Sequence, residues 1–279
     1  MRKIDQSILI SNIKQLFMNA AVSLDSKVVH ALEEAQKIES FALARSILGK
    51  IIKNQEIARN EDIPICQDTG VAVVFLEIGT EVFLDYDIEA AVNEGVRQAY
   101  FEGYLRKSVV NHPLERKNTL DNTPAIVHIK QIPGDRLIIH AAPKGAGSEN
   151  MSRLAMLPPS AGVKGIESFV LETVKLAGGK ACPPLILGIG IGGNFEKVAI
   201  LAKTALFRSL DDVAENQTDR ELEESLKELV NSSDVGPMGL GGATTCLAVK
   251  VNSYPCHIAS LPVAVNIQCH AARKKTVIL

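Results

Sequence analysis

Three of the five cysteines stand in polar, turn-rich surroundings rather than inside apolar runs. Cys66 belongs to PICQDTG, Cys182 precedes two prolines, and Cys269 lies in NIQCHAAR. A structural cysteine behaves as a small hydrophobe and is usually buried, so these settings favour thiols that bind something. Their wide separation argues against zinc, which usually takes a closely spaced C-x-x-C pair. Three dispersed ligands suit an iron–sulfur cluster with one iron left open, although spacing alone does not establish a cluster.

The other two cysteines carry weaker signals. Cys246 lies in the alternating segment TTCLAVKV, which predicts a buried structural thiol. Cys256 lies between a proline and a histidine, and composition leaves its role open. An odd number of cysteines in a chain without a recognisable secretory signal favours reduced thiols and a cytoplasmic protein.

A glycine-rich segment supports a competing interpretation. Gly188, Gly190 and Gly193 satisfy G-x-G-x-x-G between an apparent strand and a helix, a pattern typical of nicotinamide-binding oxidoreductases. That fingerprint also requires a second strand ending in an acidic residue about 20 residues further on. Here the helix leads into another helix. We therefore favour a sharp turn that presents a helix N-terminus to an anion.

Composition limits the class of protein. The 279 residues are 46% hydrophobic and 22% charged, as in ordinary soluble globular proteins. Basic and acidic residues balance, at 30 and 32, and no basic stripe marks a nucleic-acid partner. No apolar run reaches the roughly 18 residues that a membrane span needs.

The elements that position these residues are a mixture of helices and short strands. Helical periodicity marks residues 1–58, 87–110, 164–177, 194–208 and 218–230. Apolar or alternating runs predict strands at 71–79, 124–132, 135–143, 182–193, 244–254 and in the last stretch of the chain. Residues 144–163 are small and polar, which predicts a long binding loop. We expect a mixed α/β fold of small β-sheets flanked by helices, with a strand order that cannot be read from sequence. Residues 1–279 are expected to form one domain, with room for two subdomains and no clear linker.

Five blocks together resemble the α subunit of class I, iron–sulfur fumarate hydratases and L-tartrate dehydratases. The blocks are PICQDTG, KGAGSEN, CPPLILGIGIGGNFEKVAILAK, GPMGLGGATT and HIASLPVAVNIQCHAAR. They follow the expected order and span nearly the whole chain. The resemblance implies a [4Fe–4S] cluster held by Cys66, Cys182 and Cys269, with no ligand counterpart for Cys246 or Cys256.

The same resemblance implies a reversible anti hydration of fumarate to L-malate, or the related dehydration of L-tartrate. Gln67, Asp68 and His257 are then expected to be catalytic, with Asp68 as an acid–base participant or the residue that orients one. From the residues alone, Asp68 equally suits the cap of a turn, and His257 suits a hydrogen bond inside the core.

Substrate binding is expected from Gln67, Arg106, His257 and the glycine loop Gly145 to Gly147. The planar fork of Arg106 suits a carboxylate, although an arginine also suits the end of a helix. His270 and Arg273 follow Cys269 closely and are weaker candidates for a supporting role.

Single-chain members of the family continue into a second domain that supplies further arginines, a lysine and a threonine. This chain ends at Leu279, so the resemblance implies a separate β subunit, an α₂β₂ assembly in which α also pairs with itself, and a small dicarboxylate substrate. In such a pair His257 is expected to reach the neighbouring site. A non-catalytic subunit that only carries a cluster is the remaining alternative.

Overall fold

A computed structural model describes residues 2–279, which fall into two compact units. The first unit contains the chain up to Leu24 together with Gln55–Ala146 and Arg273–Leu279. The second contains Asp25–Asn54 and Gly147–Ala272. Each unit combines helices with a β-sheet, which confirms the predicted α/β class. The expectation of a single functional domain stays a prediction.

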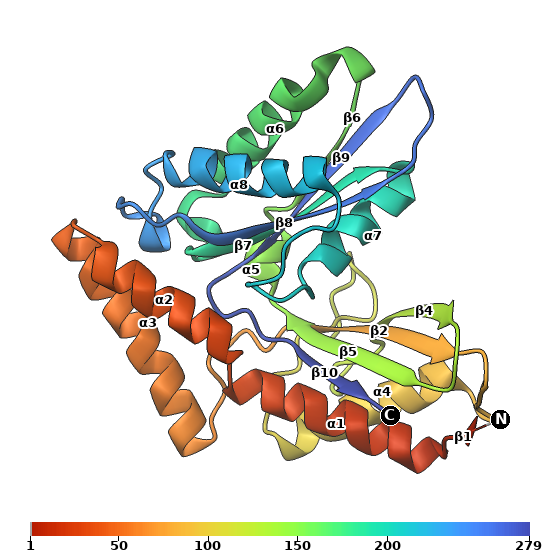
Figure 1. Cartoon of the computed structure of the whole chain (residues 1–279). Coiled ribbons are helices and arrows are strands. Elements are labelled where there is room, and N and C mark those ends of the chain that lie inside the picture. The colour runs from red at the N-terminus through yellow and green to blue at the C-terminus, as the bar shows by residue number, and fades with distance from the viewer. Residues whose placement is uncertain (1) are drawn as a thin grey trace. The chain divides into compact units, whose positions relative to one another are not determined.

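The first unit is built on a four-stranded sheet in the order β10–β5–β2–β4. Its strands are β2 (Val71–Gly79), β4 (Ile126–Ile132), β5 (Leu137–Lys144) and β10 (Lys275–Ile278). β5 runs antiparallel to β2 and to β10, whereas β4 runs parallel to β2. Helices α1 (Gln6–Val22) and α4 (Ile88–Glu102) pack against the same core as the sheet, below the strands in the view of Figure 1. β1 (Arg2–Lys3) and β3 (Val82–Phe83) form a separate parallel pair.

Apolar spacing explains the helices of this unit. In α1 the buried Leu9, Ile13 and Phe17 recur at the interval that places them on one face. The side chain of Asp87 accepts a hydrogen bond from the third residue after it and so caps α4. The predicted helix over residues 87–110 is too long, because α4 stops at Glu102, where a glycine follows. The basic residues expected at the helix end therefore lie in a loop.

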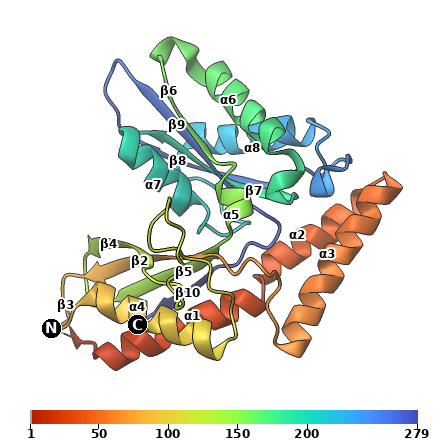
Figure 2. The ribbon, with the colours of Figure 1, turned by 180° about the vertical axis from the view of Figure 1, so that it is seen from behind.

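The second unit is built on a sheet in the order β6–β9–β7–β8. Its strands are β6 (Arg153–Leu157), β7 (Leu185–Gly192), β8 (Cys246–Tyr254) and β9 (Leu261–Gln268). Helices α6 (Gly162–Ala177) and α8 (Gln217–Asn231) pack on one face, and α7 (Phe195–Ala205) packs on the other. α8 lies in front of the strands in Figure 1, and α7 lies in front in Figure 2. α2 (Ser26–Ile38) belongs to this unit, and α3 (Ala42–Glu61) contributes residues to both units.

One further expectation needs correction. Residues 144–163 are not one long loop, because they contain the short helix α5 (Ala146–Glu149) and strand β6. The turn at Pro133–Asp135 joins β4 to β5, which lie on opposite sides of β2. Within residues 2–279, no helix is both long enough and apolar enough to span a membrane.

Candidate active site

Strand pairing brings several predicted site residues of the first unit together. Val71, the first residue of β2, pairs with Lys144, the last residue of β5. The turn that contains Asp68 precedes β2, and Gly145 follows β5, so both lie at one end of the sheet. The contact is direct, because Asp68 Oδ2 accepts a hydrogen bond from the Ala146 backbone N–H at 2.8 Å.

The Asp68 carboxylate is held on both oxygens. Its Oδ1 accepts from the Gly70 N–H at 3.1 Å, which closes the turn. Gly70 has φ +78°, and a Cβ there would lie 2.7 Å from the Lys144 backbone nitrogen, so the turn requires glycine. A Cβ on Gly145 would lie 3.0 Å from Asp68 Oδ2, close enough that the carboxylate would have to shift. Asp68 remains partly exposed, so its fixed carboxylate is still accessible for chemistry.

Buried polar side chains fix the same turn from behind. The Tyr100 hydroxyl on α4 donates to the Thr69 carbonyl at 2.6 Å and approaches the Gly70 carbonyl at 3.1 Å. Asn122, which is fully buried, donates from Nδ2 to the Gly70 carbonyl at 3.1 Å. Thr69 Oγ1 donates to the Arg106 carbonyl at 2.6 Å. These bonds place the backbone of Arg106 beside the Asp68 turn.

Sequence reasoning missed these supporting residues. Tyr100 falls on the apolar face of its helix, where it resembles any core aromatic residue, and Asn122 lies in DNTP, which resembles an ordinary turn. Neither position carries a sequence signal for its hydrogen bond. The side chain of Arg106 is exposed, as is Gln67, whereas Cys66 is partly buried.

An equivalent pairing operates in the second unit. Ile186 near the start of β7 pairs with Gln268, the last residue of β9. Cys182 lies just before β7 and Cys269 just after β9, so both cysteines lie at the same end of this sheet. The His270 N–H donates to the Cys182 carbonyl at 3.2 Å, which ties the two segments together. Both thiols belong to partly exposed residues.

Close backbone packing supports the turn before β7. Cys182 itself has φ 53° and ψ 64°, a left-handed conformation. A Cβ on Gly239 would lie 2.5 Å from the Gly179 Cα, so these two loops touch only because both residues are glycine. A Cβ on Gly147 would lie 3.3 Å from the Lys180 carbonyl oxygen. In the second unit, Gly147, Cys182 and Cys269 thus lie near the same end of the sheet.

The remaining cysteines have different settings. Cys246 is buried in β8, and desolvation raises the pKa of its thiol to about 12, as expected for an inert core residue. Cys256 is exposed, and its Sγ lies 3.3 Å from the Ser260 carbonyl oxygen. Among residues 2–279, no three His, Cys, Asp or Glu side chains are grouped to hold a metal ion. The ligand set therefore stays a prediction.

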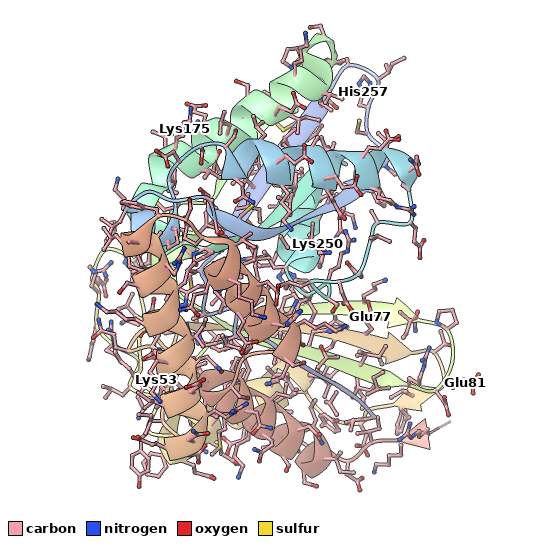
Figure 3. The ribbon with its side chains drawn as sticks, turned by 60° about the vertical axis from the view of Figure 1, so that its left-hand side comes forward. Lys53, Glu77, Glu81, Lys175, Lys250 and His257 are labelled. Carbon is pink, nitrogen blue, oxygen red and sulfur yellow. The ribbon has the colours of Figure 1, made fainter. Side chains whose placement is uncertain are left out.

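His257 lies apart from the two cysteines of its own unit. Gly192 at the end of β7 pairs with Tyr254, and His257 follows in the loop between β8 and β9, at the opposite end of the sheet from Cys182. Figure 3 shows His257 at the outer end of this loop. Its Nδ1 accepts from the Ala259 N–H at 3.1 Å, which leaves Nε2 for a further partner.

The G-x-G-x-x-G segment has a packing explanation. Gly188 and Gly190 lie inside β7 rather than in the turn after it. Their Cβ atoms would lie 2.2 Å from the Ala202 carbonyl oxygen and 2.1 Å from that of Val198. Both carbonyls belong to α7, so these glycines allow the helix to approach the strand. This explanation removes the main support for a nicotinamide site.

Comparison with known proteins decides the family. A model of the family described as fumarate hydratase (fumerase) matches residues 10–278. This chain belongs to the fumarate hydratase family. The resemblance seen in the five sequence blocks is therefore confirmed, and with it the class of hydro-lyase. Enzymes of the class I group in this family generally contain iron and sulfur.

Relatives of known name cover nearly the same length. The putative L(+)-tartrate dehydratase subunit alpha of Methanocaldococcus jannaschii is 45% identical over 267 residues, 93% of each chain. The L(+)-tartrate dehydratase subunit alpha of Escherichia coli O157:H7 is 29% identical over 255 residues, 90% of this chain and 84% of its own. Both names designate an alpha subunit.

Proposed function

We propose that this chain is the α subunit of an iron–sulfur hydro-lyase that reversibly hydrates fumarate to L-malate. The observation that carries the proposal is the match of the fumarate hydratase family to residues 10–278. The gathering of predicted site residues at the ends of β2 and β5, and of β7 and β9, supports it. These are the residues that the five sequence blocks singled out.

The proposed cofactor is a [4Fe–4S] cluster with Cys66, Cys182 and Cys269 as ligands. The chemistry of the donors fits, because all three are thiols of partly exposed residues outside any disulfide, whereas Cys246 is buried and its thiol pKa is raised. The hydrogen bond between the Cys182 and Cys269 segments adds support. When bound, the cluster would supply a Lewis acid that polarises the substrate hydroxyl group.

Asp68 is the proposed proton-transfer residue. In the dehydration direction the C–H bond beside the hydroxyl-bearing carbon breaks, and its proton passes to an Asp68 carboxylate oxygen. The electron pair of that bond forms the double bond while hydroxide leaves the neighbouring carbon. The hydrogen bonds from Gly70 and Ala146 hold the carboxylate in one orientation, which such a transfer requires.

Arg106 and Gln67 are the proposed substrate-binding side chains. Arg106 offers a planar guanidinium to one carboxylate, and its backbone is tied to the Asp68 turn through Thr69. Gln67 offers an amide from the turn itself. Gly145 leaves space next to Asp68, and Gly147 leaves space next to the Lys180 carbonyl oxygen.

The active enzyme is proposed to be an α₂β₂ assembly in the cytoplasm. The subunit designation of both named relatives supports a β partner. His257 is proposed to serve the site of a second α copy, which its distance from Cys182 along the sheet and its exposed loop support. Five free thiols support a reducing compartment.

The test is to produce the chain with and without a candidate β subunit, reconstitute both preparations with iron and sulfide without oxygen, and measure fumarate hydration. We expect activity from the assembly and little from the isolated chain. Full activity of the isolated chain would contradict a shared active site. An assembly that holds iron but hydrates no dicarboxylate would favour the non-catalytic alternative.

An Asp68→Asn assembly adds a residue-level test. We expect iron content to be unchanged and kcat to fall by about two to four orders of magnitude, the range for a lost acid or base. Asp135→Asn, in the exposed turn between β4 and β5, is the matched control and is expected to keep its activity. Near-normal turnover of Asp68→Asn with full iron would remove Asp68 from the mechanism.

L-tartrate dehydration is the second candidate activity. The name of the 45% identical relative favours it, whereas the description of the family favours fumarate. The two substrates share a four-carbon dicarboxylate skeleton, so Arg106 serves either. Parallel measurements of kcat/KM for fumarate, L-malate and L-tartrate on one preparation decide between them.

A further inference from the structure

Arg273 is a buried cation with unused hydrogen-bond donors. It follows the turn that contains Cys269, lies two residues before the start of β10, and is 3% exposed. Its Nε and Nη1 atoms are enclosed, and neither has an acceptor within residues 2–279. Burying a guanidinium without such partners is costly, because its hydration is lost and not replaced. A positive charge that stays buried despite this cost indicates a role other than core packing.

The space in front of Arg273 is shared with Asp68. The point that a Cβ of Gly145 would occupy lies 3.4 Å from Arg273 Nη2 and 3.0 Å from Asp68 Oδ2. The guanidinium and the carboxylate therefore face the same small region, which Gly145 leaves open. Both groups belong to the first unit, and β5 and β10, which precede Gly145 and follow Arg273, are paired strands.

The buried Tyr100 hydroxyl lies within the electric field of both groups. Burial raises the pKa of Tyr100, the positive charge of Arg273 lowers it, and the negative charge of Asp68 raises it. The same hydroxyl donates to the carbonyl of Thr69, the residue after Asp68. The cation and the anion thus act on one side chain that already supports the Asp68 turn.

We infer that Arg273 is a positioning residue for Asp68: its buried guanidinium holds the carboxylate in the orientation set by the Gly70 and Ala146 N–H groups. The inference rests on the proposed role of Asp68 in proton transfer. Because Arg273 is buried and Asp68 is partly exposed, the arginine acts through the carboxylate rather than by touching the substrate. Asp68 is the catalytic group, and Arg273 determines how often it is correctly placed.

The test is a double-mutant cycle in the reconstituted assembly with Arg273→Met, Asp68→Asn and the two combined. Arg273→Lys keeps the charge without the planar fork and serves as the conservative variant. Arg208→Met is the control for losing a partly buried arginine, because Arg208 pairs with Glu223 in the second unit. Each preparation is measured for iron content, thermal midpoint, kcat, KM and the isotope effect with substrate deuterated at the carbon that loses its proton.

We expect Arg273→Met to keep its iron and its KM within about twofold while kcat falls by about 10- to 100-fold, as for a displaced catalytic group. The isotope effect should increase, because proton transfer becomes slower relative to the other steps. Arg273→Lys should recover part of kcat. In the Asp68→Asn background, Arg273→Met should lower kcat by less than about twofold. Arg208→Met should lower the thermal midpoint without changing the isotope effect.

Three results would overturn the inference. A raised KM with unchanged kcat would show that Arg273 binds the substrate directly. Equal losses from Arg273→Met in both backgrounds would show that it acts independently of Asp68. If Arg273→Met does not fold, an Arg273→Lys variant with wild-type kcat and isotope effect would also overturn the inference. Failure of the proposed role of Asp68 is distinct, since Asp68→Asn alone would then leave kcat unchanged, and failure of the proposed function would leave the wild-type assembly without turnover.

Discussion

In both units the central strand, β2 or β7, has an antiparallel neighbour on one side and a parallel neighbour on the other. A cysteine-containing turn precedes each central strand, and the antiparallel neighbour ends beside that turn. The groups delivered there differ. The first unit contributes the Asp68 carboxylate, Gly145 and the proposed ligand Cys66, and the second contributes Cys182 and Cys269.

The two turns are also stabilised in different ways. Buried side chains hold the Asp68 turn, since Tyr100, Asn122 and Thr69 all bond to backbone groups within it or beside it. The turn at Cys182 depends on backbone contacts, with Gly179 packed against Gly239. A carboxylate that transfers a proton needs a fixed orientation, which hydrogen bonds provide. The proposed cysteine ligands of the second unit lie in segments held by close backbone packing and by the hydrogen bond from the His270 N–H to the Cys182 carbonyl.

The largest effect is expected from the cysteine substitutions, which test which thiols bind the cluster. Cys182→Ser, Cys269→Ser and Cys66→Ser should each abolish stable cluster binding after anaerobic reconstitution, because a serine hydroxyl is a poor substitute for a thiolate ligand. Cys246→Ser and Cys256→Ser should keep the cluster. Iron content and visible absorbance measure the outcome. Loss of the cluster in Cys256→Ser together with its retention in Cys269→Ser would show that the ligand assignment is wrong.

Gly239→Ala tests the dependence of the second unit on backbone packing. Its new Cβ would lie 2.5 Å from the Gly179 Cα, so the free energy of unfolding should fall by about 3 kcal/mol. Iron retention should fall as well, because Gly179 belongs to the turn before Cys182. Urea denaturation and iron analysis measure both effects.

Gly134→Ala is the matched control for this variant. Gly134 also has a positive φ, +93°, but a Cβ there meets nothing within 4 Å. It should lose only about 1 kcal/mol from backbone strain and keep its iron. Equal losses in the two variants would show that strain, rather than contact between the loops, explains the Gly239 effect.

Asn122→Ala tests the side-chain support of the first unit. Asn122 is fully buried, and its removal leaves the Ser108 N–H, now bonded at 2.6 Å, and the Gly70 carbonyl without this partner. We expect a loss of about 2 kcal/mol in the free energy of unfolding and a lower kcat, with unchanged iron. Asn122→Asp keeps the acceptor but sets a buried carboxylate oxygen against the Gly70 carbonyl oxygen, so it should lose at least as much. Iron loss without a change in kcat would contradict the division of roles between the units.

Tyr100→Phe is the smallest of these changes. The ring and its packing remain, and only the hydroxyl that donates to the Thr69 carbonyl at 2.6 Å is removed. The free energy of unfolding should fall by about 1 kcal/mol, the usual net value of one hydrogen bond. Urea denaturation measures it. A loss above about 3 kcal/mol would indicate that the hydroxyl supports more than one turn.

Short sequence patterns predicted those helices and strands whose signal lies within a few neighbouring residues. Residues 71–79 were predicted as a strand to the residue, because an apolar run bounded by glycines has one clear interpretation. The helix from Asp87 was predicted correctly at its cap and eight residues too long at its end, since helical spacing continues past Gly103 without helical structure. Sequence also missed the strand and short helix within 144–163.

For the candidate site, the sequence predicted some residues and missed others. The cysteine settings and the five blocks identified the family, which the comparison confirmed, whereas Tyr100 and Asn122 could not be recognised. Their roles depend on hydrogen bonds to residues 13 or more positions away, and the sequence around them resembles an ordinary core helix or turn. Gly188 and Gly190 suggested a nicotinamide site, although packing explains them. A phosphate-binding motif and a strand packed closely against a helix can both place glycines at this spacing.

By itself the sequence determined the α/β class, the family, and the residue types available for chemistry, because each depends on composition, spacing or ordered blocks along the chain. Only the tertiary structure decided which residues meet. Strand order places the start of β2 beside the end of β5, and the start of β7 beside the end of β9. These pairings join residues more than 70 positions apart, such as Asp68 and Ala146. Long-range pairing follows from how whole sheets bury their apolar faces, and no local pattern specifies it.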